Sequence, residues 1–169
     1  PYALTKLTGE HYCRMFARHY GLSTVSLRYF NVFGPGQALD DEYAVVIPKF
    51  INCMLNDEPP PIYGTGRQSR DFTYVDNVVK ANILATQKVK LDARVFNVGC
   101  GKNYTIFDLV KALNKIMHKN IKPVFLKPRI GDVLKTQADI SNITKELNYE
   151  PKIGFIEGLE LTIGYFKNA

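Results

Sequence analysis

The sequence has few cysteines and no long apolar run, and both shortages narrow the kinds of protein it can encode. Its three cysteines, Cys13, Cys53 and Cys100, are odd in number and widely separated. Neither a disulfide framework nor a Cys-x-x-Cys metal site fits them. No apolar stretch approaches the roughly 18 residues that a membrane-spanning helix needs, and the first residues have no signal-peptide pattern. We therefore expect a globular, cytoplasmic protein with no membrane contact.

Metal-binding and dinucleotide-binding patterns are also missing. The histidines at 11, 19 and 118 have no ligand spacing between them, so no metal site is expected. Gly64-x-Gly66 is not followed by a helical pattern, and Gly99-x-Gly101 lacks the third glycine of the dinucleotide fingerprint. The chain by itself is therefore not expected to hold a dinucleotide.

Positive charge is concentrated in the second half of the chain, which has a net charge of +6 overall. From Lys111 to Lys135 there are seven basic residues and one acid, Asp132. A polyanion-binding face would have this composition, and so would a helix surface covered by lysine. Aromatic residues are not interleaved with these lysines, which argues against single-stranded nucleic acid as a partner.

Hydrophobic periodicity predicts helices that alternate with short strands, the pattern of an α/β protein. The expected helices are 2–20, 46–55, 78–87, 106–118, 140–147 and 155–166. The expected strands and extended segments are 24–29, 62–63, 69–73, 94–98 and 123–126. We expect Gly21 to end the first helix, a capping box at Thr105 and Asp108, and N-caps at Asp76 and Asp139.

Tyr2 and Lys6 are four residues apart on the first predicted helix, which places the phenol and the ammonium on one face. A cation beside a phenol favours its ionised form, which acts as a general base. A surface pair with no chemical role has the same spacing. The residues that follow must therefore distinguish a catalytic pair from an ordinary surface pair. They are a β-branched strand, Asn31 and a Gly-Pro-Gly turn.

Over essentially all of its length the chain resembles the C-terminal part of the extended short-chain dehydrogenase/reductase family, the NAD-dependent nucleotide-sugar epimerases and dehydratases. The run Tyr2–Lys6 is similar to the family's Tyr-x-x-x-Lys motif, and Leu27–Pro35 is similar to the start of its substrate loop. The run Tyr43–Phe50 is most similar to that of UDP-N-acetylglucosamine (UDP-glucose) 4-epimerases. The resemblance implies that the N-terminal half of the family fold, with the glycine-rich loop and the Ser/Thr partner of the tyrosine, is absent.

The resemblance also implies roles for individual residues. Tyr2 would take the proton from the sugar 4′-hydroxyl, Lys6 would hold the phenolate and bond the nicotinamide ribose, and Phe30 would lie near the nicotinamide of NAD. The residues expected to bind the substrate are Asn31, Arg70 and Arg129 at the diphosphate, Asp132 at the ribose, Val46, Pro61 and Tyr63 at the uracil, and Thr136 beside the sugar.

Several of these substrate residues also have a structural interpretation. Asn31 suits a turn, Tyr63 suits a core, and either arginine could form a salt bridge, although guanidinium forks match phosphate oxygens especially well. The position of Thr136 holds a bulky tyrosine in epimerases restricted to UDP-glucose. A small residue there permits an N-acetyl group without requiring one.

We therefore predict that residues 1–30 are the last part of a Rossmann domain and that 31–169 form the smaller substrate-binding lobe with interleaved Rossmann elements. The predicted function is NAD-dependent 4-epimerisation of a UDP-hexose through a 4-keto intermediate, in a homodimeric parent enzyme. This chain alone is expected to be inactive, with NAD bound mainly by the absent half. The alternatives are a UDP-glucuronate decarboxylase, a sugar-nucleotide dehydratase, or a non-catalytic UDP-binding or dimerisation fragment.

Overall fold

The computed structural model describes residues 1–38, 46–88 and 91–168. The helices in these ranges are α1 (Tyr2–Tyr20), α2 (Val46–Leu55), α3 (Val75–Thr86), α4 (Ile106–Met117), α5 (Ser141–Leu147) and α6 (Phe155–Asn168). The strands there are β1 (Val25–Tyr29), β2 (Val32–Phe33), β3 (Pro61–Tyr63), β4 (Ser69–Arg70), β5 (Thr73–Tyr74), β6 (Arg94–Val98), β7 (Tyr104–Thr105) and β8 (Val124–Leu126). Every predicted helix and strand has a counterpart in the predicted order, whereas the short strands β2 and β7 were not predicted.

The strands form pairs, most of which are parallel. β1 pairs in parallel with β6, β2 with β5, and β3 with β8, while β4 and β7 are antiparallel. Parallel partners need a long connection, which the intervening helices supply. Strands far apart in the sequence therefore meet.

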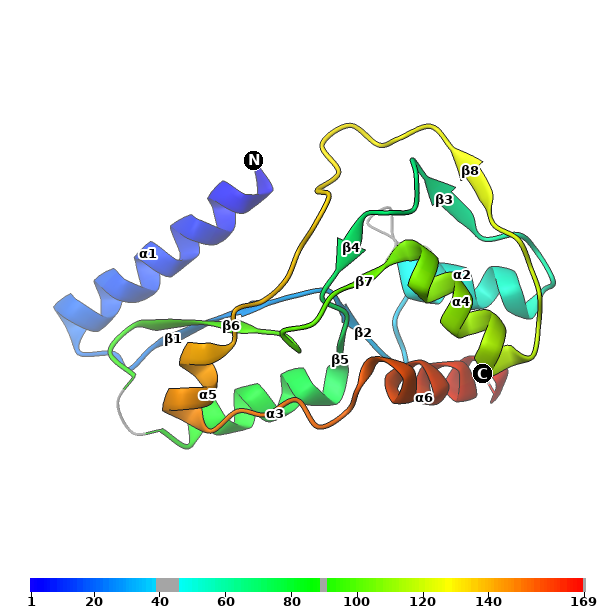
Figure 1. Cartoon of the computed structure of the whole chain (residues 1–169). Helices are drawn as coiled ribbons and strands as arrows, with labels where there is room; N and C mark the ends of the chain where they lie inside the picture. Colours follow the sequence, from blue (N-terminus) through cyan, green and yellow to red (C-terminus); the bar gives the residue numbers. More distant parts are fainter. Residues whose placement is uncertain (39–45, 89–90, 169) are drawn as a thin grey trace.

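One part of the molecule is the β1–β6 pair with helices on both sides. Figure 1 shows α1 on one side of the pair and α3 with α5 on the other. The buried core of this part lies on the side of α3 and α5, and it includes Phe96, Val98, Ile143 and Tyr149. The structure describes all of α1, and none of its residues is buried.

The other part is a lobe in which α2, α4 and α6 surround a larger core, with β3 and β8 at its outer end (Figure 1). The Phe33 ring meets the rings of Phe72, Tyr74 and Phe155 edge-on. Gly158 lets α6 approach this cluster, because a Cβ there would lie 2.8 Å from Cζ of Phe33. Dense packing of this kind fixes α6 against β2.

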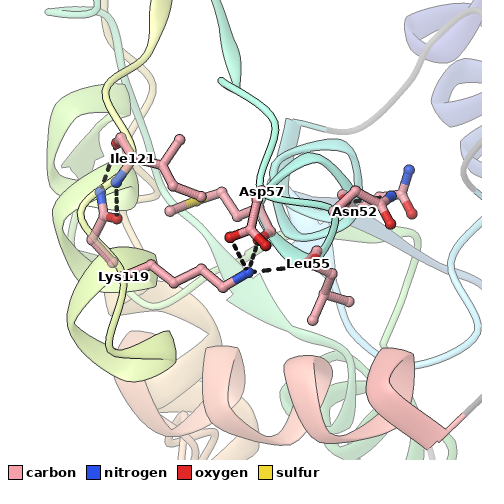
Figure 2. A network of polar contacts seen from close by, with 8 residues as sticks. Asn52, Leu55, Asp57, Lys119 and Ile121 are labelled. Atoms are coloured by element: carbon pink, nitrogen blue, oxygen red, sulfur yellow. Dashed lines mark hydrogen bonds and ion pairs between the residues drawn. The ribbon is translucent and has the colours of Figure 1, made fainter.

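A lysine from the end of α4 holds the C-terminal end of α2. Figure 2 shows the Lys119 side chain reaching across to this end. Its Nζ donates to the carbonyls of Met54, at 2.6 Å, and Leu55, at 3.3 Å, and to Oδ1 of Asp57, at 2.7 Å. The last carbonyls of a helix have no partner within it, and a cation there also suits the helix dipole. The orientation of α2 is thereby tied to that of α4.

The helix ends confirm two of the predicted caps. Gly21 ends α1 in the left-handed region, with φ 67°. Thr105 and Asp108 form the capping box of α4: the Asp108 N–H donates to the Thr105 hydroxyl at 3.0 Å, and the Thr105 N–H donates to the Asp108 carboxylate at 2.9 Å. The first N–H groups of a helix have no partner within it, and the capping box satisfies those of Thr105 and Asp108 with local side chains.

The other two predicted N-caps are wrong. α3 begins at Val75 with Tyr74 as its N-cap, so Asp76 lies inside the first turn. The extended Thr73–Tyr74 strand runs straight into the helix and leaves no separate capping residue. Ile140 is the N-cap of α5, and Asp139 accepts instead from the Ser141 N–H at 2.9 Å, one residue before the cap. The predicted motif at Tyr43–Phe50 begins outside the described residues.

The described residues contain neither a membrane-spanning helix nor a cluster of metal ligands. No helix there is long and apolar enough to cross a membrane. Nor do those residues contain a group of three or more His, Cys, Asp or Glu side chains that could hold a metal ion.

Candidate functional site

A pocket of about 420 Å³ opens between α2, β3, β4 and the segment after β8. Seven of the eight residues predicted to bind substrate line it: Asn31, Val46, Pro61, Tyr63, Arg70, Arg129 and Asp132. The eighth, Thr136, lies beside it, because its hydroxyl donates to Oδ1 of Asn31 at 3.2 Å. The fold therefore brings together residues that are more than a hundred positions apart.

Each side of the pocket comes from a different element. Asn31 stands between β1 and β2, and Val46 is the first residue of α2. Pro61 and Tyr63 lie on β3, whose parallel partner β8 leads directly to Arg129. The parallel pairing of β3 with β8 is thus what carries the second half of the chain to this pocket.

The apolar wall includes residues that sequence reasoning missed. Phe50, Ile62, Phe72 and Ile106 also line the pocket. Phe50 could have been found, because it is one helical turn after Val46 and shares its face. Ile62 points toward the core side of β3 and is 1% exposed, so no pattern separates it from ordinary core.

Gln68 is a further polar residue that the sequence analysis did not single out. It lines the pocket, and its side-chain Nε2 donates to the Tyr63 carbonyl at 2.7 Å. This bond spans the turn between β3 and β4.

The charged residues of the pocket contact one another or an aromatic ring. Arg70 forms an ion pair with Asp132, and its Nη1 donates to the Ser69 carbonyl at 2.8 Å. The Arg129 guanidinium lies over the Tyr63 ring, with Cζ 4.0 Å from the centroid. Arg129 lowers the pKa of the Tyr63 phenol, chiefly by hydrogen bonding. Neighbouring side chains thus hold both guanidinium groups at the pocket. The salt bridge that was the structural interpretation of Arg70 is present.

The predicted catalytic pair lies elsewhere. Tyr2 and Lys6 are on α1 and are not among the described residues that line the pocket. The Lys6 Nζ is 5.3 Å from the centroid of the Tyr2 ring, so the two side chains share a face as expected. Tyr2 is 73% exposed. Phe30 is partly buried at the end of β1, next to Asn31, and its N–H donates to the Val98 carbonyl at 3.0 Å.

Polar contacts attach α1 to β1. Arg28 donates two hydrogen bonds to Glu10, at 2.6 and 2.7 Å, and these bonds lower the pKa of the Glu10 carboxyl. The Thr24 hydroxyl donates to the Cys13 carbonyl at 3.1 Å. The orientation of Tyr2 and Lys6 relative to the strand is therefore set by a bidentate ion pair and one hydrogen bond.

The comparison with protein families decides the assignment. Residues 1–99 match the NAD dependent epimerase/dehydratase family. The chain belongs to this family. The resemblance read from Tyr2, Lys6 and the 27–35 run is thereby confirmed.

Solved structures and curated relatives agree with this assignment. A UDP-glucose 4-epimerase from Thermotoga maritima with UDP-glucose has a TM-score of 0.94 and 42% identity over 99% of this chain and 53% of its own. A UDP-N-acetylglucosamine 4-epimerase from Methanobrevibacter ruminantium in complex with UDP-N-acetylmuramic acid has a TM-score of 0.94 and 43% identity over 99% and 54%. A putative UDP-glucose 4-epimerase of Methanocaldococcus jannaschii is 35% identical over 99% of this chain and 53% of its own length.

The predicted fold class is confirmed, since the α/β arrangement with parallel strands matches part of the Rossmann-type epimerase structures. The chain spans about half the length of the curated relatives it matches. Those relatives include UDP-sugar 4-epimerases and UDP-sugar decarboxylases. The family is NAD-dependent, and relatives have been solved with UDP-sugars and with NAD.

Proposed function

We propose that this chain binds a UDP-hexose and that, within the complete family fold, it supports NAD-dependent 4-epimerisation through a 4-keto intermediate. UDP-glucose and UDP-N-acetylglucosamine are the substrates that we favour. The observation that carries the proposal is the pocket itself, which combines an apolar wall, two guanidinium groups and a carboxylate in one cavity.

The chemistry of the lining residues fits each part of a uridine diphosphate. The volume of about 420 Å³ lies in the range of small-ligand pockets. Val46, Pro61 and Phe50 line the pocket and offer apolar contacts to the base. Arg70 and Arg129 offer donor forks that match diphosphate oxygens. Asp132 accepts hydrogen bonds, which suits the ribose hydroxyls.

The proposed proton transfer involves α1. Tyr2 as the phenolate would take the proton from the sugar 4′-hydroxyl, and the Lys6 ammonium would stabilise that phenolate. Bound NAD would supply the hydride acceptor at the sugar C4. Tyr2 and Lys6 are both exposed on one helix face, which fits a cofactor ribose lying against them. No residue pattern of the chain supplies the glycine-rich turn for the cofactor diphosphate, so that group would be held elsewhere.

The test is calorimetric titration of the chain with UDP and with uridine. We expect Arg70→Ala to weaken UDP by about 1.5–3 kcal/mol, as for hydrogen bonds to charged groups, and to change uridine little. Arg67→Ala is the matched control, because Arg67 is exposed just before β4 and is not among the described residues that line the pocket. If the chain does not bind UDP, or if Arg67→Ala weakens it as much as Arg70→Ala, the proposal is wrong.

UDP-uronate decarboxylation is the second candidate, and relatives of that activity support it. A UDP-N-acetyl-alpha-D-glucosaminuronate decarboxylase from Bacillus cytotoxicus is 30% identical over 98% of this chain. Product analysis with the complete fold separates the two. An epimer of unchanged mass supports epimerisation, whereas loss of CO₂ from a UDP-uronate supports the decarboxylase.

A further inference from the structure

Asp71, between β4 and β5, is a carboxylate with no exposed surface. Its Oδ1 accepts from the Cys100 N–H at 2.9 Å and from the Thr73 hydroxyl at 3.3 Å. Its Oδ2 accepts from the N–H groups of Gly101, at 2.9 Å, and Ala138, at 3.0 Å. These partners, all within the described ranges, are neutral. A buried charge is costly unless it is fully hydrogen-bonded, and backbone N–H groups provide that compensation here.

Three of the four bonds, those from backbone N–H groups, join Asp71 to two segments that are distant in the sequence. Asp71 follows β4, Cys100 and Gly101 follow β6, and Ala138 precedes α5. Gly99 allows this close meeting, because a Cβ there would lie 2.5 Å from Cβ of Ala138 and 2.9 Å from Oδ2 of Asp71. The junction therefore has no room for any side chain at position 99.

One of these segments carries part of the pocket. We call residues 127–138 the strap; it runs from β8 to the region before α5, and it includes Arg129, Asp132 and Thr136. Residues 127–135 are all exposed, and Ala138, at 4% exposure, is the buried residue of the strap. In Figure 1 the strap is the long yellow-to-orange trace that leaves β8 and descends to α5.

The C-terminal end of the strap is attached beside β4. The Ser69 N–H donates to the Leu134 carbonyl at 2.9 Å, and the Thr136 N–H donates to the Ser69 carbonyl at 3.0 Å. The bond from Ala138 to Asp71 completes this attachment at the point where the strap becomes buried. The backbone next to Arg70 and the strap that holds Asp132 are thus fixed to one another.

We propose that Asp71 is a positioning residue for nucleotide binding: its carboxylate anchors the strap and thereby places Arg129 and Asp132 at the pocket. The nature of the ligand rests on the proposed function, whereas the anchoring itself does not. Asparagine has the same shape, but its amide N–H₂ would point at backbone N–H groups and leave at least one donor unsatisfied. Asp71→Asn should therefore release the strap while keeping the core volume.

Hydrogen exchange read peptide by peptide tests the anchoring. We expect faster exchange in peptides covering 127–138 for Asp71→Asn, and also for Gly99→Ala, which keeps the carboxylate but forces Ala138 away. Asn77→Ala is the matched control: Asn77 is 2% exposed and accepts from the N–H groups of Lys152, at 2.9 Å, and Ile153, at 3.1 Å. Loss of the Asn77 side chain should speed hydrogen exchange in the segment before α6 and leave hydrogen exchange in the strap unchanged.

Binding gives the second readout. Asp71→Asn and Gly99→Ala should each weaken UDP by about tenfold or more, the size of a lost hydrogen bond to a charged group. Uridine should lose less, because its ribose meets Asp132 but it has no diphosphate for Arg129. If Asp71→Asn does not fold, Gly99→Ala decides. Unchanged strap exchange in the folded variants, or equal losses for UDP and uridine, would overturn the proposal. Failure of the unsubstituted chain to bind UDP would reject the proposed function, while the exchange data would still decide whether Asp71 holds the strap.

Discussion

The helix with the predicted catalytic pair and the lobe with the pocket are built in opposite ways. α1 buries none of its residues and is attached to β1 by polar contacts such as Glu10 with Arg28. The pocket lobe surrounds a large apolar core and a buried, fully bonded carboxylate, Asp71. The difference indicates that the pocket, which we propose to bind the nucleotide, is shaped by the packing of this chain itself. The residues proposed for proton transfer, in contrast, lie on a helix with no buried residue. We therefore expect the two proposed functions to respond separately to substitution.

The largest effect should come from Tyr2→Phe in an enzyme with the complete family fold. Loss of a general base lowers turnover by about 10²–10⁴-fold, while UDP affinity should stay unchanged because Tyr2 does not line the pocket. Turnover and calorimetry on one preparation measure both. Tyr12→Phe, at another exposed tyrosine of α1, is the control. A variant that keeps more than about a tenth of the rate would show that Tyr2 is not the base.

The next largest effect concerns Arg129. Arg129→Ala should weaken UDP by about 10- to 100-fold, and Arg129→Lys should recover little of that loss. Lysine keeps the charge but has neither the planar fork nor the stacking over the Tyr63 ring. Lys127→Ala, an exposed cation of the same strap, controls for a general charge effect. Full recovery by lysine, measured calorimetrically, would mean that charge alone acts at this position.

A third prediction concerns the exposed apolar residues of α1. Leu4, Leu7, Met15 and Phe16 are each at least 42% exposed, and apolar stripes of this kind mark association surfaces. We expect the chain to dimerise at micromolar concentration. Leu7→Glu with Met15→Lys should weaken the dimer by about tenfold or more, equal to about 1.4 kcal/mol.

Sedimentation velocity measures that dimer. The control is Val79→Glu with Ile83→Lys on α3, where the apolar residues are equally exposed but belong to the other side of the β1–β6 pair. A stable monomer of the unsubstituted chain would show that the exposed apolar residues of α1 do not cause dimerisation. Equal weakening of the dimer by the control would show that the interface is not on α1.

The sequence predicted well what depends on near neighbours. The periodicity of the hydrophobic residues predicted where the helices lie. The Thr105–Asp108 spacing predicted the cap of α4, because both partners lie within one helical turn. The family resemblance named seven residues that the fold gathers in one pocket. Their proposed roles in binding stay predictions.

Contacts between distant segments could not be predicted in this way. Asp71 bonds Ala138, 67 residues later, and Arg70 pairs with Asp132, 62 residues later. Such pairs leave no period in the sequence, because parallel strand pairing brings them together. The misplaced N-cap at Asp76 has a similar cause: the strand that enters α3 is held by β2 across the sheet, and this non-local pairing sets where the helix begins.

The smallest effect should come from the capping box of α4, a helix of the pocket lobe. Its start differs from that of α1. α1 starts with no side-chain cap, whereas the Asp108 carboxylate accepts from the N–H of Thr105, at 2.9 Å, and from its hydroxyl, at 2.7 Å. These bonds lower the pKa of Asp108 from its ordinary value of 3.8. The stabilisation is therefore fully present above pH 3.8 and is lost as the pH falls through the lower folded-state pKa. At neutral pH, Asp108→Asn should cost about 1 kcal/mol of unfolding free energy, and in acid the gap should close.

Urea unfolding at neutral pH and at about pH 2.5 measures that gap. Asp76→Asn is the matched control, because Asp76 lies in the first turn of α3 but makes no capping bond among the described residues. It should show the weaker, dipole-based loss of about 0.3–1 kcal/mol. A difference between the unsubstituted chain and Asp108→Asn that persists in acid would mean that the cap does not depend on the ionised carboxylate. Since α4 supplies Ile106 to the pocket wall, the same pH series on UDP affinity shows whether fraying of this helix end reaches the site.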